Sequence, residues 1–194
     1  MKKRIVPKTT LILLLFTLLL AWSAVLPGRA DSLIKSKEFT TRTFYADGDD
    51  DEVEFTENFG FAGDSYLNSG RFRMDITLTP VYNSIWISSD GERANLATEP
   101  AIVNLINGRL NARIDTATGG EFQPDYGSDG MIRSFRYSRS DLLSDDLTYA
   151  NFTVTLPDEY AIESLFYQYG EDLEIDDVQY SVKFNVKVSI YGNA

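Results

Sequence analysis

The chain has 194 residues and a formal net charge of −11 at pH 7, and it contains neither histidine nor cysteine. The absence of cysteine excludes disulfides, so the fold must be stabilised by its core. The absence of histidine removes the usual zinc ligand and excludes Ser-His and Cys-His catalytic pairs.

The first thirty residues have the pattern of an export signal. An apolar run over residues 9–26 follows a basic stretch that contains Lys2, Lys3, Arg4 and Lys8. Pro27 then ends any helix, and residues 28–30 supply the small side chains that a signal peptidase recognises. The sequence therefore predicts a signal peptide over residues 1–30 and one secreted, extracytoplasmic domain over residues 31–194. The alternative is an uncleaved anchor, because the apolar run approaches the ~20 residues that span a bilayer.

Cleavage after Ala30 would leave a strongly acidic protein. The remaining domain would contain 13 Lys and Arg residues and 29 Asp and Glu residues, which gives a formal charge of −16. Nucleic acids and anionic membrane surfaces are bound through basic patches, so both are poor partners for this domain. We expect no membrane insertion after cleavage, and we expect attraction to cations and basic partners.

Alternation of apolar and polar residues predicts most elements of the domain. This alternation predicts a strand over residues 71–79, between Gly70 and Pro80, with Phe72, Met74, Ile76 and Leu78 on one face. Shorter candidate strands cover residues 39–45, 53–61, 85–87, 131–137 and 152–156. Residues 102–106 and 109–114 flank Asn107-Gly108, a pair that favours a type I′ turn, and this predicts a hairpin.

The last part of the domain combines a helix and a long strand. Residues 158–169 carry apolar side chains at helical spacing between Pro157 and Gly170, with Tyr169 on the predicted buried face. A further short helical turn is a candidate within residues 140–147, with Ser140 as its cap. Residues 178–190 alternate strictly and predict a long strand. The predicted fold is all-β: an antiparallel β-sandwich, or a jelly-roll-like domain, with one short helix that covers an open end.

Two acidic segments are candidates for a metal site. Carboxylates at Asp47, Asp49, Asp51 and Glu52 have a spacing that suits calcium, so Ca²⁺ is the candidate cofactor. The EF-hand pattern is not met, because it needs Gly at the sixth position and Glu at the twelfth. A solvated acidic turn between two strands is the favoured alternative. The second segment covers residues 171–177 and has the same alternative explanation.

Candidate ligand-binding residues lie in two places. Residues 119–130 form a predicted long loop in which Phe122, Asp125, Tyr126 and Asp129 can stack on a sugar ring and bind its hydroxyls. A surface loop with one aromatic residue in the core explains this segment equally well. Trp86 lies between Ile85 and Ile87, so it is a core residue or an exposed aromatic on a strand, and the core position is favoured.

These features favour a non-catalytic extracytoplasmic β-sandwich that binds a ligand or assembles at the cell surface. In the binding version, loops and calcium hold a glycan or a protein. In the fibre version, residues 31–45 pair as a strand with another copy of the chain. The alternative is a small glycan-active hydrolase that uses paired carboxylates, a signal with little specificity in a chain with 29 acids.

Overall fold

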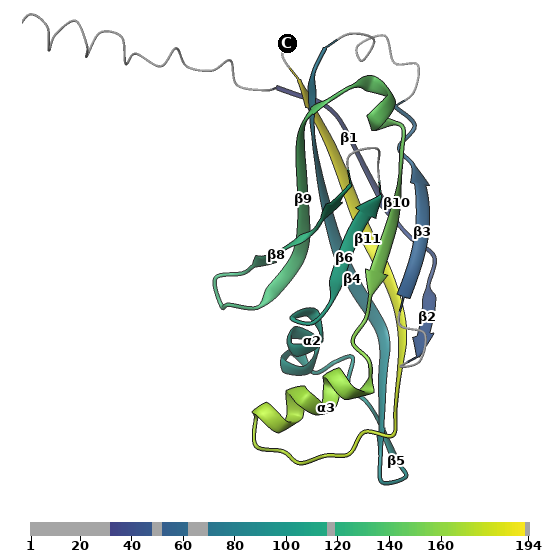
Figure 1. Cartoon of the computed structure of the whole chain (residues 1–194), viewed down its shortest axis with the longest axis vertical. Helices are drawn as coiled ribbons and strands as arrows, with labels where there is room; N and C mark the ends of the chain where they lie inside the picture. Colours follow the sequence, from purple (N-terminus) through teal and green to yellow (C-terminus); the bar gives the residue numbers. More distant parts are fainter. Residues whose placement is uncertain (1–31, 48–51, 62–69, 116–118, 193–194) are drawn as a thin grey trace, which may run out of the picture. The chain divides into compact units, whose positions relative to one another are not determined.

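The computed structural model describes residues 32–47, 52–61, 70–115 and 119–192, and these residues form two antiparallel sheets that pack face to face (Figure 1). The larger sheet has the order β1-β11-β4-β9-β8, and β2 and β5 extend it by pairing with β11 and β4. Its strands are β1 (Ser32–Thr40), β2 (Phe44–Asp47), β4 (Phe72–Ser89), β5 (Glu92–Asn95), β8 (Gln123–Tyr126), β9 (Ile132–Leu142) and β11 (Asp177–Gly192). The predicted all-β sandwich is confirmed.

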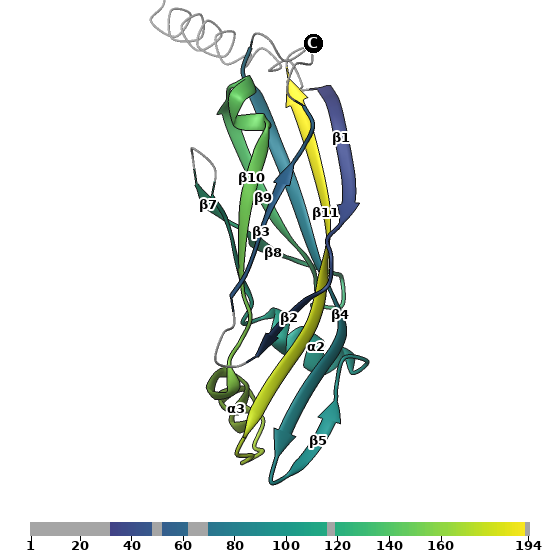
Figure 2. The same ribbon diagram turned by 90° about the vertical axis from the view of Figure 1, so that its right-hand side faces the viewer.

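The smaller sheet has the order β3-β10-β6-β7 and covers only part of the larger one. Its strands are β3 (Glu52–Asn58), β6 (Asn111–Asp115), β7 (Gly120–Glu121) and β10 (Tyr149–Thr155). The remaining length of β4 and β11 extends past this sheet, toward α2 (Pro100–Asn107) and α3 (Glu159–Gln168), as Figures 1 and 2 both show. One end of the domain is therefore helical, as the sequence predicted.

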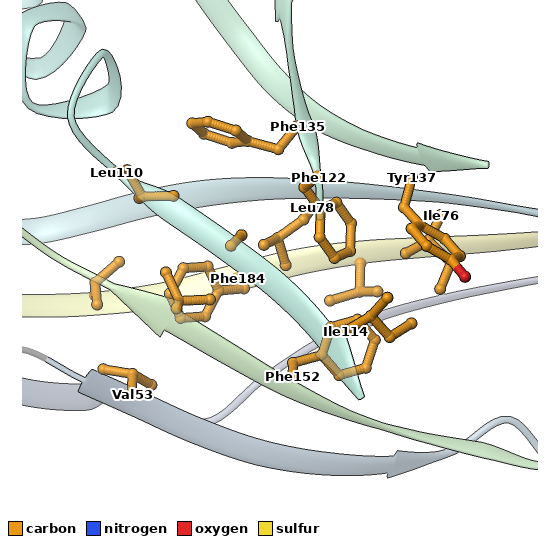
Figure 3. Packing of buried hydrophobic residues seen from close by; sticks show 14 of the residues in the cluster. Val53, Ile76, Leu78, Leu110, Ile114, Phe122, Phe135, Tyr137, Phe152 and Phe184 are labelled. Carbon is orange, nitrogen blue, oxygen red and sulfur yellow. The ribbon is translucent and has the colours of Figure 1, made fainter. Parts of the chain in front are cut away.

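Aromatic and aliphatic side chains fill the space between the sheets (Figure 3). Phe55 of β3 stacks on Phe152 of the neighbouring β10 with ring centroids 4.7 Å apart, and on Phe184 of β11 at 5.6 Å. Phe152 and Phe184 are almost completely buried, so this stack joins the two layers. Buried aromatic surface of this kind stabilises a core strongly, which fits a domain that has no disulfide.

β4 continues through Pro80, where the sequence predicted its end. Proline cannot donate a ladder hydrogen bond, but the pairing of β4 with β9 ends at Leu78. Among the described residues, no strand pairs with that edge of β4 at Pro80. The predicted strands 71–79 and 85–87 are therefore parts of one strand.

A β-bulge at Asn83 reverses the alternation of β4. Val182 of β11 pairs with Tyr82 and Ser181 pairs with Ser84, which leaves Asn83 as an extra residue. Even-numbered residues such as Leu78 face the core before the bulge, and odd-numbered residues face it afterwards. The extra residue therefore allows the apolar side chains of both halves of β4 to face the core.

The predicted hairpin at Asn107-Gly108 is wrong, because the residues before it form α2. Pro100 lies in the first turn of this helix, where a missing N–H costs no hydrogen bond. The short apolar run 102–106 fits a helix as well as a strand, so its periodicity could not distinguish the two. Asn107 ends the helix with its side chain buried, and its Oδ1 accepts a hydrogen bond of 2.9 Å from the hydroxyl of Tyr82.

The other local predictions are largely confirmed. α3 begins after Asp158, whose Oδ1 accepts a hydrogen bond of 2.8 Å from the N–H of Ala161. The short turn forms at Ser144–Leu147, but its cap is Leu143 rather than Ser140, because β9 continues to Leu142. Tyr169 was predicted on the buried face and is instead 69% exposed, since it lies just beyond the end of α3.

The N-terminal segment pairs within its own chain. β1 pairs with β11 from Ser32 to Thr40, and β2 continues along the same strand to Asp47. The predicted strand 39–45 is therefore interrupted at residues 41–43. The hydroxyl and N–H of Thr41 both bind the backbone of Phe184 at this break, at 3.0 and 2.9 Å.

Deletion of Asn83 should destabilise the fold far more than its substitution. Removing the extra residue restores regular pairing. The buried residues of β4 either before or after position 83 then turn toward solvent, which lowers the free energy of unfolding by ~3 kcal/mol or more. Asn83→Ala keeps the bulge and should cost less than ~1 kcal/mol. Urea unfolding measures both, and equal stabilities of the two variants would contradict this account of β4.

Tyr82→Phe should lower the free energy of unfolding by ~1–3 kcal/mol, because it leaves the buried amide oxygen of Asn107 without its donor. The matched control is Tyr126→Phe, which removes the same hydroxyl from a side chain that is 61% exposed. Urea unfolding should show no comparable loss for this control.

Alkaline pH should destabilise the wild-type protein more steeply than the Tyr82→Phe variant. Burial raises the pKa of the Tyr82 hydroxyl above its ordinary value of 10.0, so the folded state keeps a proton that the unfolded chain releases near pH 10. The stabilisation is complete below that pH and is lost as the pH rises beyond it. Unfolding free energies measured from pH 8 to 11 test this, and parallel profiles would refute it.

Candidate functional site

The predicted ligand-binding loop is a pair of short strands and a hairpin turn. Residues 119–130 contain β7 and β8, and β8 pairs with β9. Phe122 is 5% exposed and lies in the core, with its ring centroid 5.8 Å from that of Tyr137 and 6.2 Å from that of Phe152. Its ring is therefore not presented at the surface, and ligand binding by the rest of this segment stays a prediction.

The two carboxylates of this hairpin bind arginines of the same hairpin. Asp125 Oδ2 lies 2.9 Å from Arg136 Nη2, and it also accepts a hydrogen bond of 3.3 Å from the hydroxyl of Ser134. Asp129 forms an ion pair with Arg133. The remaining candidate, Tyr126, is 61% exposed. Both carboxylates therefore have partners within the hairpin.

Trp86 lies on the outer face of β4 rather than in the core. Ile85 and Ile87 are buried on the opposite face, and Trp86 is partly exposed. The guanidinium of Arg93 lies over the Trp86 ring, 4.7 Å from the ring centroid. The favoured core position was therefore wrong. Trp86 pairs with Asn95 of β5, far along the sheet from the β8–β9 hairpin (Figures 1 and 2). The structure does not bring Trp86 and Tyr126 to one site.

The predicted calcium ligands are only partly described. Asp47 ends β2, and Glu52 begins β3, where it is exposed and lies 3.5 Å from Arg113. Asp49 and Asp51 lie outside the described residues. Within the described ranges, no group of three or more acidic side chains is placed to hold a metal ion. Calcium binding by this segment stays a prediction.

An exposed aromatic surface lies at the helical end, and it is the feature that the sequence analysis missed. Tyr160, Tyr167 and Tyr169 are 71%, 73% and 69% exposed. Tyr160 and Tyr167 are seven residues apart and share one face of α3, while Ile162 and Leu165 are buried on the other. A helical projection of residues 159–168 would have placed these two tyrosines opposite the core.

The acidic connector 171–176 is held between α3 and β4. Ile175 donates its N–H to Glu163 Oε1 at 2.9 Å, and Asp176 donates its N–H to the carbonyl of Ser88 at 2.9 Å. The hydroxyl of Ser89 donates to the carbonyl of Glu174 at 2.7 Å. These hydrogen bonds fix the connector next to the exposed tyrosines.

Two hollows meet at Leu173, which is 39% exposed. The first has a volume of about 550 Å³ and lies between α3 and the connector, with Tyr160 and Tyr167 in its lining. The second, of about 530 Å³, lies between the β4–β5 hairpin and α3. We call the exposed side chains around them the helical-end surface: Tyr160, Tyr167, Tyr169, Leu173, Glu171, Asp172 and Glu174.

The helical-end surface is strongly acidic. Residues 157–182 contain eight acidic residues and no lysine or arginine. These acids are Asp158, Glu159, Glu163, Glu171, Asp172, Glu174, Asp176 and Asp177. A surface with tyrosine rings, one exposed leucine and a negative field can pack against a partner and select for positive charge.

The paired-carboxylate arrangement of a hydrolase needs a cleft between two acids. The described side chains between the sheets are apolar and fill the interior (Figure 3). In the hollow beside α3, Glu163 binds the N–H of Ile175 and therefore helps to hold the connector. Glu171, Asp172 and Glu174 also line this hollow, and the hydrolase alternative stays a prediction.

The helices in the described part of the chain are too short or too polar to cross a membrane. Residues 1–30, which carry the predicted signal peptide, lie outside the described residues. No protein-family model matches this sequence, and no curated protein is detectably similar to it.

Proposed function

We propose that the protein is a non-catalytic, extracytoplasmic β-sandwich that binds a partner at the cell surface through its helical-end surface. The exposed trio of Tyr160, Tyr167 and Tyr169 is the observation that carries this proposal. Tyrosine is enriched at interfaces because its large, rigid ring buries apolar area at little entropic cost and its hydroxyl still bonds. Export rests on the predicted signal peptide.

The way in which α3 is held supports a binding role. Its cap at Asp158 and its buried Ile162 and Leu165 fix the helix on the sandwich, so Tyr160 and Tyr167 are carried by a rigid element. The hydroxyl of the buried Tyr180 donates a hydrogen bond of 2.8 Å to the carbonyl of Pro157, which anchors the residue just before the helix. A fixed surface loses little conformational entropy on binding.

The fibre version has less support. β1 and β2 already pair with β11 of their own chain, so assembly by exchange of residues 31–45 would first require them to leave it. Lys35 and Lys37 also lie on this edge strand, and charged residues of this kind disfavour edge-to-edge pairing. Binding of a distinct partner is therefore the better-supported version.

Replacing Tyr160, Tyr167 and Tyr169 together by serine should lower binding to the surface of the producing cells at least ~10-fold, because most of the exposed ring area is lost. Labelled protein, expressed from the full chain and purified, is added to cells that lack their own copy, and bound label is counted by flow cytometry.

The matched control replaces three exposed tyrosines of the sheets by serine. These are Tyr45, Tyr126 and Tyr149, which are 81%, 61% and 57% exposed. It should bind like the wild-type protein. Wild-type binding by the α3 variant, or an equal loss in the control, would contradict the proposal.

A further inference from the structure

We infer that the hollow between the β4–β5 hairpin and α3 is a docking groove for a basic polypeptide segment, with one apolar side chain of that segment in the groove. This inference rests on the proposed function and names the class of partner. We call this hollow the hairpin groove.

The hairpin groove is apolar inside. Its apolar lining consists of Ile87, Ala94, Leu96, Phe166, Leu173 and Ile175. Ile87 and Ile175 are buried at the bottom, whereas Ala94 is exposed and Leu173 is 39% exposed. Ala94 pairs with Ile87 across the β4–β5 ladder, so both side chains lie on the same face of the hairpin. The volume of about 530 Å³ can take a leucine-sized or larger side chain.

The rim of the hairpin groove is negative. Asp90 and Glu92 border it on the hairpin side, and Glu174 lies on the connector next to Leu173. Among the described residues of the lining, only Arg93 is basic, and its guanidinium lies over the ring of Trp86 on the other face of the hairpin. The side chains that remain at the rim therefore favour lysine or arginine on either side of the docked apolar residue.

Other occupants fit the hairpin groove less well. A sugar needs several polar side chains at its hydroxyls, whereas the floor of this groove is aliphatic and aromatic. A second copy of the chain that docked through this same surface would bring one acidic helical end against another, because residues 157–182 carry no basic residue. Like charges at such an interface oppose self-docking.

Defined peptides test this inference with the protein expressed from the full chain. The probe is a fluorescent peptide with the sequence Gly-Lys-Lys-Leu-Lys-Lys-Gly, and its dissociation constant is measured by anisotropy. Replacement of its leucine by glycine should weaken binding at least ~10-fold, as should replacement of its four lysines by glutamate. The affinity should also fall as salt is raised from 50 to 300 mM, because exposed charges are screened. Equal affinity for the three peptides would overturn the inference.

Two variants, each with a matched control, test whether the peptide binds in the hairpin groove. Ala94→Phe fills the groove from an exposed strand position, and Ala101→Phe makes the same change at an exposed position outside the lining. Glu92→Lys reverses a rim charge, and Glu121→Lys does so on β7 of the other sheet. The two groove variants should weaken binding at least ~10-fold and the two controls should not, with urea unfolding as a check on the fold. Equal effects in each pair would overturn the inference.

The two proposals can fail separately. If the tyrosine variant loses cell binding while the peptide shows none of these dependences, the partner is not a basic segment in the hairpin groove, and the helical-end surface still binds. If groove variants alter peptide affinity while the tyrosine variant binds cells normally, the groove stands and the proposed tyrosine surface fails. A complex that forms only with soluble glycan, or only between copies of the chain, would overturn the basic-segment inference.

Discussion

The ladder between β4 and β11 is the interaction on which the rest of the domain depends. It runs from Asp177 paired with Ser88 to Gly192 paired with Phe72, and it lies at the centre of the larger sheet. One part of it faces the smaller sheet and the other part extends toward the helical end, so the same two strands contribute to the core along its whole length (Figure 1). The bulge at Asn83 lies between these parts and adjusts the alternation of β4 so that Leu78 and Ile85 are both buried. Without disulfides, the stability of the domain rests on this continuous buried face.

Much of this fold could be predicted because its signals are local. The alternation of residues 178–190 and the apolar spacing of residues 159–168 correspond directly to β11 and α3. The errors arose where tertiary pairing decides. Pro80 is tolerated because β9 has already left that edge of β4. Residues 102–106 are helical, and Asn107 at the end of this helix accepts a hydrogen bond from the distant Tyr82. The local sequence contains neither fact, since both depend on residues far away in the chain.

The candidate site shows a similar division. Glycine, aromatic and acidic residues around Tyr126 have the composition of a binding loop, yet Phe122 packs in the core and Asp125 and Asp129 bind Arg136 and Arg133. The helical-end surface has the opposite character. Its connector was recognised only as an acidic segment, and the exposure of Tyr169 depends on where α3 ends. Composition identifies residues that are able to bind, but the partners that a fold provides decide which of them remain presented to a ligand.

In the proposed function, one end of the sandwich recognises the partner, and its other end and its sheet faces have no part in binding. Hydrogen–deuterium exchange of the protein, measured free and bound to cell envelopes that lack their own copy, tests this assignment most directly. We predict slower exchange on binding in α3, the connector 171–176 and β5, with unchanged exchange in the β8–β9 hairpin and β1. Protection confined to the β8–β9 hairpin or to β1, with no change in α3, would contradict the central claim.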